Sequence, residues 1–210
     1  MTFAQKERER LGALLLEVGP DAPTLNDGWA THDLAVHLYI REFKTWKAGG
    51  ILIESLEGIL DAETKKQMKR PYDEVVRDWA GGPPVWLKPV DSKVNTAEFF
   101  IHHEDVRRGD GTIAPREFSK AVNEELFTWA KRFAKMSLKG SPVPVILTPP
   151  NFPPETVGDS AGVSEKGNKV LRVSGEPGEL LIWASGRVDS AKVELSGAVD
   201  EFKSFTVKER

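Results

Sequence analysis

The segment from Asn95 to Arg108 reads NTAEFFIHHEDVRR and holds two of the four histidines of the chain. Within it, Glu98 and His102 are four positions apart. In a helix, both side chains lie on one face, one turn apart. A carboxylate oxygen and an imidazole nitrogen at that spacing can bind one divalent metal ion, and they suit zinc as well as nickel, iron or manganese. Two ligands make an incomplete site, so a third must come from another helix.

The third ligand is predicted in the segment THDLAVHLYIRE. Helical spacing places Leu34, His37 and Leu38 on one side of this segment. A histidine between two leucines points toward the interior of a helical bundle, where it could reach Glu98 and His102. Two nitrogens and one oxygen leave coordination positions open, which is the arrangement of catalytic metals rather than structural ones.

Each of these residues also has an interpretation without a metal. Asn95 and Glu98 are three positions apart and could form a capping box at the start of a helix. His37 and His102 could be hydrogen-bonded core histidines. His103 is turned by about 100° from its neighbour around a helix axis. It is therefore predicted to pack or form a hydrogen bond instead of binding the same ion.

The remaining charged side chains of the segment leave alternatives open. Asp105 is three positions after His102 and could orient the ligand imidazole. It could equally pair with Arg41 or Arg108. Arg107 and Arg108 complement the dipole at the end of a helix, and one of them could reach an anionic substrate.

Helical patterns must position these residues, and they fill the first two-thirds of the chain. Apolar positions recur at helical spacing, and caps, glycine or proline mark the ends. A bundle of about four main helices is therefore expected over residues 1–138. The expected helices are Phe3–Val18, Thr31 to about Lys47, Asp61–Lys69, Pro71–Trp79, Asn95–Arg108 and Pro115–Lys135.

The pattern changes near Lys139, where proline and β-branched residues disfavour helix. GSPVPVILTPPNFPPETVG is expected to hold a strand followed by a loop, and KVLRVSG and AKVELSG one strand each. EPGELLIWASGR is predicted to be a helix, and AVDEFKSFTV a short helix or an irregular tail. Residues 139–210 are therefore expected to form a small α+β domain, in a chain that is mainly α.

The composition limits the chemistry and the partners. The chain has 210 residues, no cysteine and a formal net charge of −3. A slightly acidic chain has no general attraction for nucleic acid or an anionic membrane. Any thiol chemistry must use a thiol that arrives with a cofactor. The N-terminal MTFAQKERERLGALLLEVG is an amphipathic helix pattern rather than a signal peptide, so a cytoplasmic location is expected.

The two histidine segments resemble the N-terminal metal-binding domain of the mycothiol-dependent maleylpyruvate isomerase family, within the DinB-like superfamily of four-helix bundles. GWATHDLAVHL is similar to the family's Gly-Trp, Asp-Leu and His-Leu pattern. NTAEFFIHHEDVRR is similar to its Glu-x-x-x-His-His-x-Asp pattern. The resemblance implies that His37, Glu98 and His102 are the metal ligands. The residues that carry the two patterns are Gly28, Trp29, Asp33, Leu34, His37, Leu38, Glu98, His102, His103 and Asp105.

The resemblance extends to the C-terminal part of the chain. The family's second domain is a small α/β unit of sterol-carrier-protein-like shape, and VSGEPGELLIWASGRV is similar to its helix. The isomerase uses an arginine of this domain at its active site, and Arg187, in a Gly-Arg pair, is the matching residue. The resemblance thus implies a catalytic role for Arg187 toward a substrate carboxylate. It also implies a divalent metal, zinc first, and mycothiol as a low-molecular-weight thiol partner.

The second motif departs from the isomerase, because it continues as His-Glu-Asp-Val-Arg-Arg, which resembles a distinct actinobacterial branch. The resemblance therefore implies a metal site and a thiol cofactor without the same substrate. Thiol transfer or cis–trans isomerisation of a small electrophile is the expected activity. The alternatives are a non-catalytic protein that binds a metal or a lipid-like ligand, and a partner-binding module without a metal. An enzyme would need Arg187 to be directed at the metal.

Overall fold

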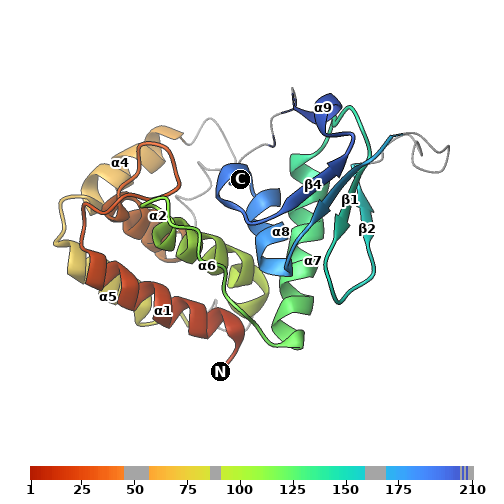
Figure 1. Cartoon of the computed structure of the whole chain (residues 1–210). Coiled ribbons are helices and arrows are strands. Elements are labelled where there is room, and N and C mark those ends of the chain that lie inside the picture. The colour runs from red at the N-terminus through yellow and green to blue at the C-terminus, as the bar shows by residue number, and fades with distance from the viewer. Residues whose placement is uncertain (45–56, 86–90, 159–168, 204, 206, 208–210) are drawn as a thin grey trace. The chain divides into compact units, whose positions relative to one another are not determined.

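The computed structural model describes residues 1–44, 57–85, 91–158, 169–203, 205 and 207. The chain divides into two compact units, Met1–Thr112 and Ile113–Arg210. In the described part, eight α-helices accompany one four-stranded mixed sheet (Figure 1). The chain is thus mainly helical with α+β character in its C-terminal part, as the sequence predicts in outline. None of the described helices has both the length and the apolar character needed to cross a membrane.

The first unit is a set of packed helices around one apolar core. α1 packs on α5 and α6, and α2 packs on α4 and α5. The helices are α1 (Phe3–Val18), α2 (Thr31–Phe43), α4 (Glu57–Gln67), α5 (Tyr72–Ala80) and α6 (Asp91–Arg107). One cluster of buried core residues contains Ala4, Leu11, Leu15, Leu34, Ala35, Val36, Leu38, Ile40, Val75, Val76, Trp79, Phe99 and Val106.

The bounds of α1 agree with the prediction, and α2 begins at Thr31 as expected. Asp33 caps α2, since its carboxylate accepts a hydrogen bond from the backbone N–H of Ala30 at 3.0 Å. The predicted continuation of this helix to about Lys47 falls on residues 45–56, which lie outside the described residues.

The helix α6 begins at Asp91, earlier than the predicted start at Asn95. Asn95 is therefore inside the helix, and its Oδ1 accepts a hydrogen bond from the guanidinium of Arg41. The interpretation of Asn95 and Glu98 as a capping box is wrong, because an N-cap residue must precede the helix.

The second unit places helices beside a short mixed sheet. The strands follow the order β2-β1-β3-β4, with β1 and β3 parallel and the two outer pairs antiparallel. β2 falls in the stretch that was predicted to be a loop. The elements are α7 (Lys120–Ser137), β1 (Val145–Thr148), β2 (Glu155–Val157), β3 (Leu171–Ser174), α8 (Pro177–Ala184), a 3-10 turn (Val188–Ser190), β4 (Glu194–Gly197) and α9 (Val199–Phe202).

The long helix α7 belongs to this second unit. It packs on α8 and contacts β2, whereas the sequence places it in the bundle before a boundary at residue 138. The two compact units divide along the chain between Thr112 and Ile113. α7 also begins at Lys120 rather than Pro115, because Ser119 takes the extended N-cap conformation that serine favours.

The loop between α1 and α2 lies against the C-terminal end of α6. The backbone N–H of Leu25 donates to the carbonyl of Asp105 at 3.1 Å. A Cβ at Gly109 would come within 2.0 Å of the carbonyl oxygen of Pro23, so only glycine permits this approach. Gly109 therefore fixes the path of a loop that also carries Trp29.

Replacing Gly109 with alanine should destabilise the protein by about 1–3 kcal/mol, because the loop backbone must move away from α6. Chemical denaturation followed by circular dichroism measures this change. Gly58→Ala is the matched control. Gly58 lies in α4 with no atom near its missing Cβ, so alanine there should be neutral or stabilise by up to about 1 kcal/mol. Equal stability of Gly109→Ala and the native protein would contradict the close approach.

Candidate metal centre

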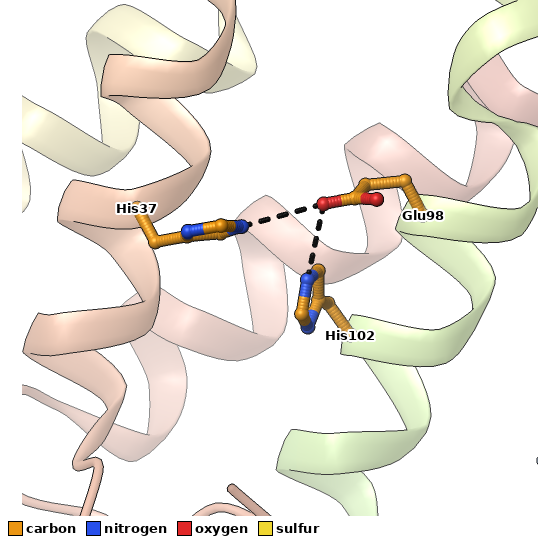
Figure 2. Close-up of side chains that lie close together, drawn as sticks. All are labelled: His37, Glu98 and His102. Carbon is orange, nitrogen blue, oxygen red and sulfur yellow. Dashed lines mark hydrogen bonds and ion pairs between the residues drawn. The ribbon is translucent and has the colours of Figure 1, made fainter. Parts of the chain in front are cut away.

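His37 of α2 and Glu98 and His102 of α6 point toward one another in the first unit (Figure 2). Glu98 Oε1 lies 3.4 Å from His37 Nε2 and 3.2 Å from His102 Nε2. One ligand atom from each residue lies within 4.8 Å of the other two. The structure thus brings together the three side chains that the sequence selects.

These separations fit the coordination sphere of a small divalent ion. Bonds of about 2.0–2.1 Å from a tetrahedral metal to nitrogen and oxygen place two ligand atoms about 3.3 Å apart. The two N–O separations, 3.4 and 3.2 Å, lie close to that value. One ion could therefore be held by His37, Glu98 and His102 with small side-chain movements, and its fourth position would stay open.

Asp105 orients the imidazole of His102. Its Oδ2 lies 2.8 Å from His102 Nδ1, and the aspartate is fully buried. With the proton on Nδ1, His102 donates to this carboxylate and presents the lone pair of Nε2 to the side of Glu98. Of the alternatives open for Asp105, the structure therefore supports the one in which it orients the imidazole.

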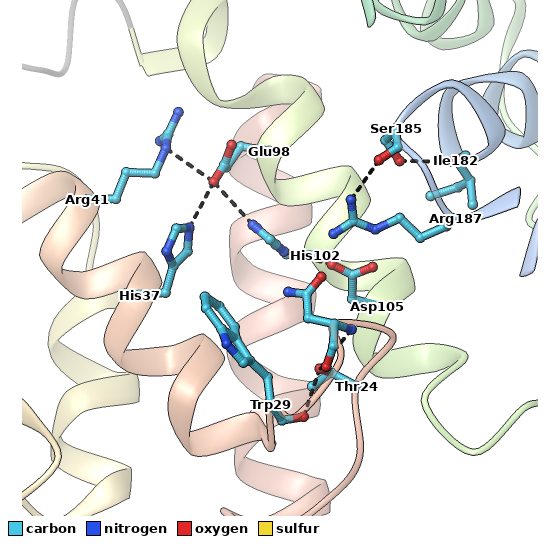
Figure 3. Close-up of polar contacts among 11 residues, drawn as sticks. Thr24, Trp29, His37, Arg41, Glu98, His102, Asp105, Ile182, Ser185 and Arg187 are labelled. Carbon is cyan, nitrogen blue, oxygen red and sulfur yellow. Dashed lines mark hydrogen bonds and ion pairs between the residues drawn. The ribbon is translucent and has the colours of Figure 1, made fainter. Parts of the chain in front are cut away.

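Arg41 adds a positive charge beside Glu98 (Figure 3). Its Nε lies 3.2 Å from Glu98 Oε1, the same oxygen that both histidines face, and its guanidinium also donates to Asn95. The sequence does not select Arg41 as a site residue. Its position four residues after His37 is the signal that could have found it, since both side chains lie on the same face of α2.

Burial and mutual contacts shift the pKa of each residue in the cluster. Burial lowers the pKa of His37 more than the hydrogen bond with Glu98 raises it. Burial also opposes charge on His102, but its hydrogen bonds with Asp105 and Glu98 outweigh this and raise the pKa to about 9. Burial alone would raise the pKa of Glu98, but hydrogen bonds with the two imidazoles hold it well below its ordinary value. In metal-free protein at neutral pH, a charged His102 therefore lies between two carboxylates.

Trp29 lies beside His37, with the two rings in a tilted arrangement. The two ring centroids are 5.3 Å apart, with the planes tilted by 55°. The loop that carries Trp29 is held by Thr24, whose hydroxyl donates to the carbonyl of Trp29 at 2.9 Å and accepts from the backbone N–H of Asn26 (Figure 3). The sequence marks Trp29 only as part of a Gly-Trp pattern, and its contact with His37 is seen only in the structure.

His103 lies outside the cluster. Its Nδ1 is 2.9 Å from a carboxylate oxygen of Glu7 of α1, and both side chains are buried. The predicted hydrogen bond of His103 is therefore confirmed.

The two arginines at the end of α6 pair with Glu104. Arg108 Nε lies 2.6 Å from Glu104 Oε2, and only 1 % of the Arg108 side chain is exposed. Arg107 binds both oxygens of the same carboxylate at 2.8 Å. Arg107 lies in the last turn of α6, as the helix-dipole interpretation requires, and both arginines also compensate the charge of a buried glutamate.

Arg187 lies in the second unit, directly after α8. Its guanidinium donates to the carbonyl of Ser185 at 2.9 Å (Figure 3), and the residue is 7 % exposed. Gly186 has a φ of 100°, a conformation that favours glycine and turns the chain out of α8. The Gly-Arg pair thus ends the helix as expected, and the catalytic role of Arg187 stays a prediction.

Comparisons of the chain with models of protein families, with curated proteins and with solved structures found no match. A function for the chain must therefore be inferred from the residues and distances of the cluster.

Replacing Asp105 with asparagine should weaken metal binding by about 10- to 100-fold, because the imidazole of His102 loses its charged acceptor. Competition with a chromophoric chelator measures the dissociation constant. Asp73→Asn is the control, since Asp73 pairs with Arg77 on the exposed face of α5 and should leave the affinity unchanged. An Asp105→Asn variant with native affinity would show that this hydrogen bond does not support the site.

Metal affinity should rise with pH, because a divalent ion must displace the proton from His102 Nε2. The pKa of His102 is about 9, so below that value the apparent affinity should rise about tenfold per pH unit. His37 and Glu98 have lowered pKa values and are already deprotonated above neutral pH. Binding measured between pH 7 and 8 tests the slope, and a constant affinity over that range would contradict the raised pKa.

Proposed function

We propose that the chain is a divalent-metal-binding enzyme that uses a low-molecular-weight thiol, of which mycothiol is the first candidate. The proposed architecture is a DinB-like bundle followed by a sterol-carrier-protein-like domain. The observation that carries the proposal is the approach of two imidazole Nε2 atoms, from His37 and His102, to one oxygen of Glu98 at 3.4 and 3.2 Å. Such a set of three ligands leaves a coordination position open, as catalytic metal sites do.

Zinc is the proposed metal. Two neutral imidazoles and one carboxylate suit its borderline character, and the separations fit a tetrahedral sphere. Nickel, iron and manganese accept the same ligand types. His37, Glu98 and His102 would hold the ion, while Asp105 orients His102 through its second nitrogen.

A bound divalent ion would supply a Lewis acid that lowers the pKa of a thiol and keeps it as thiolate at neutral pH. The chain has no cysteine, so this thiol would come from outside. Arg41 supports the site through its contact with Glu98, which favours the charged carboxylate that a cation requires.

In the proposed reaction, the thiolate sulfur forms a bond to one carbon of a conjugated double bond, and the π electrons move onto the conjugated carbonyl. Rotation about the resulting single bond and loss of the same thiolate give the trans isomer. Protonation of the neighbouring carbon instead gives the thioether product of a transferase. Arg187 would bind a substrate carboxylate through two parallel hydrogen bonds.

Native protein should contain one divalent metal ion per chain, and His37→Ala and His102→Ala should lose it, because each variant leaves only two ligands. Elemental analysis of purified protein measures the content. His103→Ala is the matched control, since His103 binds Glu7 instead and should retain the ion. Circular dichroism verifies that each variant is folded. Equal metal content in all four proteins would exclude the proposed site.

Adding mycothiol to cobalt-substituted protein should produce a thiolate-to-metal charge-transfer band, because the open position allows sulfur to bind the ion. Absorption spectroscopy detects the band, and the S-methylated thiol serves as the control. Stoichiometric metal with no spectral response would favour the alternative, a non-catalytic protein that binds a metal or a small lipid-like ligand.

A further inference from the structure

A separate pocket adjoins the candidate metal centre in the first unit. We propose that it binds the cationic end of a small organic ligand, such as a quaternary or primary amine. This inference rests on the proposed metal site, because a ligand held there would contact His37, one of the three candidate ligands. The pocket, called the Trp29 pocket below, has a volume of about 240 Å³, and its lining includes Trp29, Asp33, His37, Ile40, Leu60 and Asp61.

The charge of the Trp29 pocket favours a cation. Among the described residues that line it, both charged ones, Asp33 and Asp61, are carboxylates, and no lysine or arginine is present. Asp33 uses one oxygen to cap α2 through the N–H of Ala30. Asp61 lies on α4 with its side chain exposed. A ligand carboxylate placed beside Asp33 and Asp61 would meet like charge.

The aromatic wall also favours a cation. Trp29 is the best cation–π partner among the aromatic residues. Its loop is fixed by the hydrogen bond from the Thr24 hydroxyl, by the bond from Leu25 to the carbonyl of Asp105, and by the close approach at Gly109. A wall that is already positioned loses little conformational entropy when a ligand binds.

The size and remaining walls restrict the ligand further. Pockets for drug-sized molecules measure about 300–1,000 Å³, and about 240 Å³ is below that range. Ile40 and Leu60 supply apolar surface that suits methyl or methylene groups around the charge. The pocket therefore fits an ammonium group with a short carbon chain, whose other end can extend past His37.

A matched pair of probes tests the charge alone. Choline and 3,3-dimethylbutan-1-ol have nearly the same shape and the same hydroxyl, but only choline is charged. Calorimetry on zinc-loaded protein should show choline binding about tenfold more tightly, as a cation–π contact with two nearby carboxylates predicts. Equal affinity for the two probes, or tighter binding of the neutral one, would overturn the inference.

Variants test whether the preference for choline over the neutral probe arises in the Trp29 pocket. Asp61→Asn and Trp29→Leu should each reduce the ratio of the two affinities at least threefold. Asp21→Asn removes an equal charge from the exposed α1–α2 loop outside the pocket and should leave the ratio unchanged. Asp61 is exposed, so its variant should fold even if Trp29→Leu does not. A ratio unaffected by Asp61→Asn would also overturn the inference.

Two further readouts separate this inference from the proposed metal site. Metal content is measured on every sample, so stoichiometric metal without a preference for choline would reject the cation pocket alone. Protein that takes up no zinc but still prefers choline would reject the metal proposal and keep the cation pocket. With cobalt in place of zinc, the methyl protons of bound choline should broaden in the NMR spectrum. No broadening would overturn the placement of the ligand beside the metal.

Discussion

The pairing of buried charges along α6 is the constraint on which the first unit depends. Ionisable side chains from His102 to Asp105, together with Arg108, are all at most 8 % exposed. A buried charge without a partner costs several kcal/mol, so each of these groups must meet a complementary one. Some partners come from α6 itself, as in the pair of Glu104 and Arg108, and others come from the helices packed on it. Alignment of these helices is therefore specified by polar contacts as well as by the apolar core.

The same requirement explains how one helix carries two different histidines. His103 faces α1, where its Nδ1 lies within hydrogen-bond distance of the Glu7 carboxylate. His102 faces α2 and, together with His37 of that helix and Glu98 of α6, surrounds the candidate metal position. A neighbouring buried pair, Arg8 of α1 with Glu42 of α2 at 2.8 Å, joins the same two helices. The adjacent histidines thus serve two interfaces, which a helix makes possible because consecutive side chains diverge around its axis.

Much of the cluster could be predicted from spacing, because helical periodicity converts sequence separation into shared faces. Predicting that Glu98 and His102 share a face required only that their segment form a helix. Predicting that His37 points inward required only the positions of the neighbouring leucines. Trp29 could not be found this way, since it lies in a loop whose path depends on the contact between Gly109 and Pro23. The burial of Arg108 could not be predicted from spacing either, because it depends on the ion pair with Glu104. For the fold, the helical N-terminal part followed from periodicity. The packing of α7 on α8 did not, because a stripe of apolar residues does not identify the element that it contacts.

Asp105 connects two parts of the first unit, one through its side-chain carboxylate and the other through its backbone carbonyl. Its side chain orients His102, while its carbonyl accepts the N–H of Leu25 from the loop that carries Trp29. A metal ion bound to His102 would therefore affect Asp105 through its side chain, and a molecule stacked on Trp29 would affect it through its backbone. By thermodynamic linkage, the factor by which the ion changes the affinity for that molecule equals the factor by which the molecule changes the affinity for the ion. One aspartate would then couple the two binding events without any direct contact between the ion and the molecule.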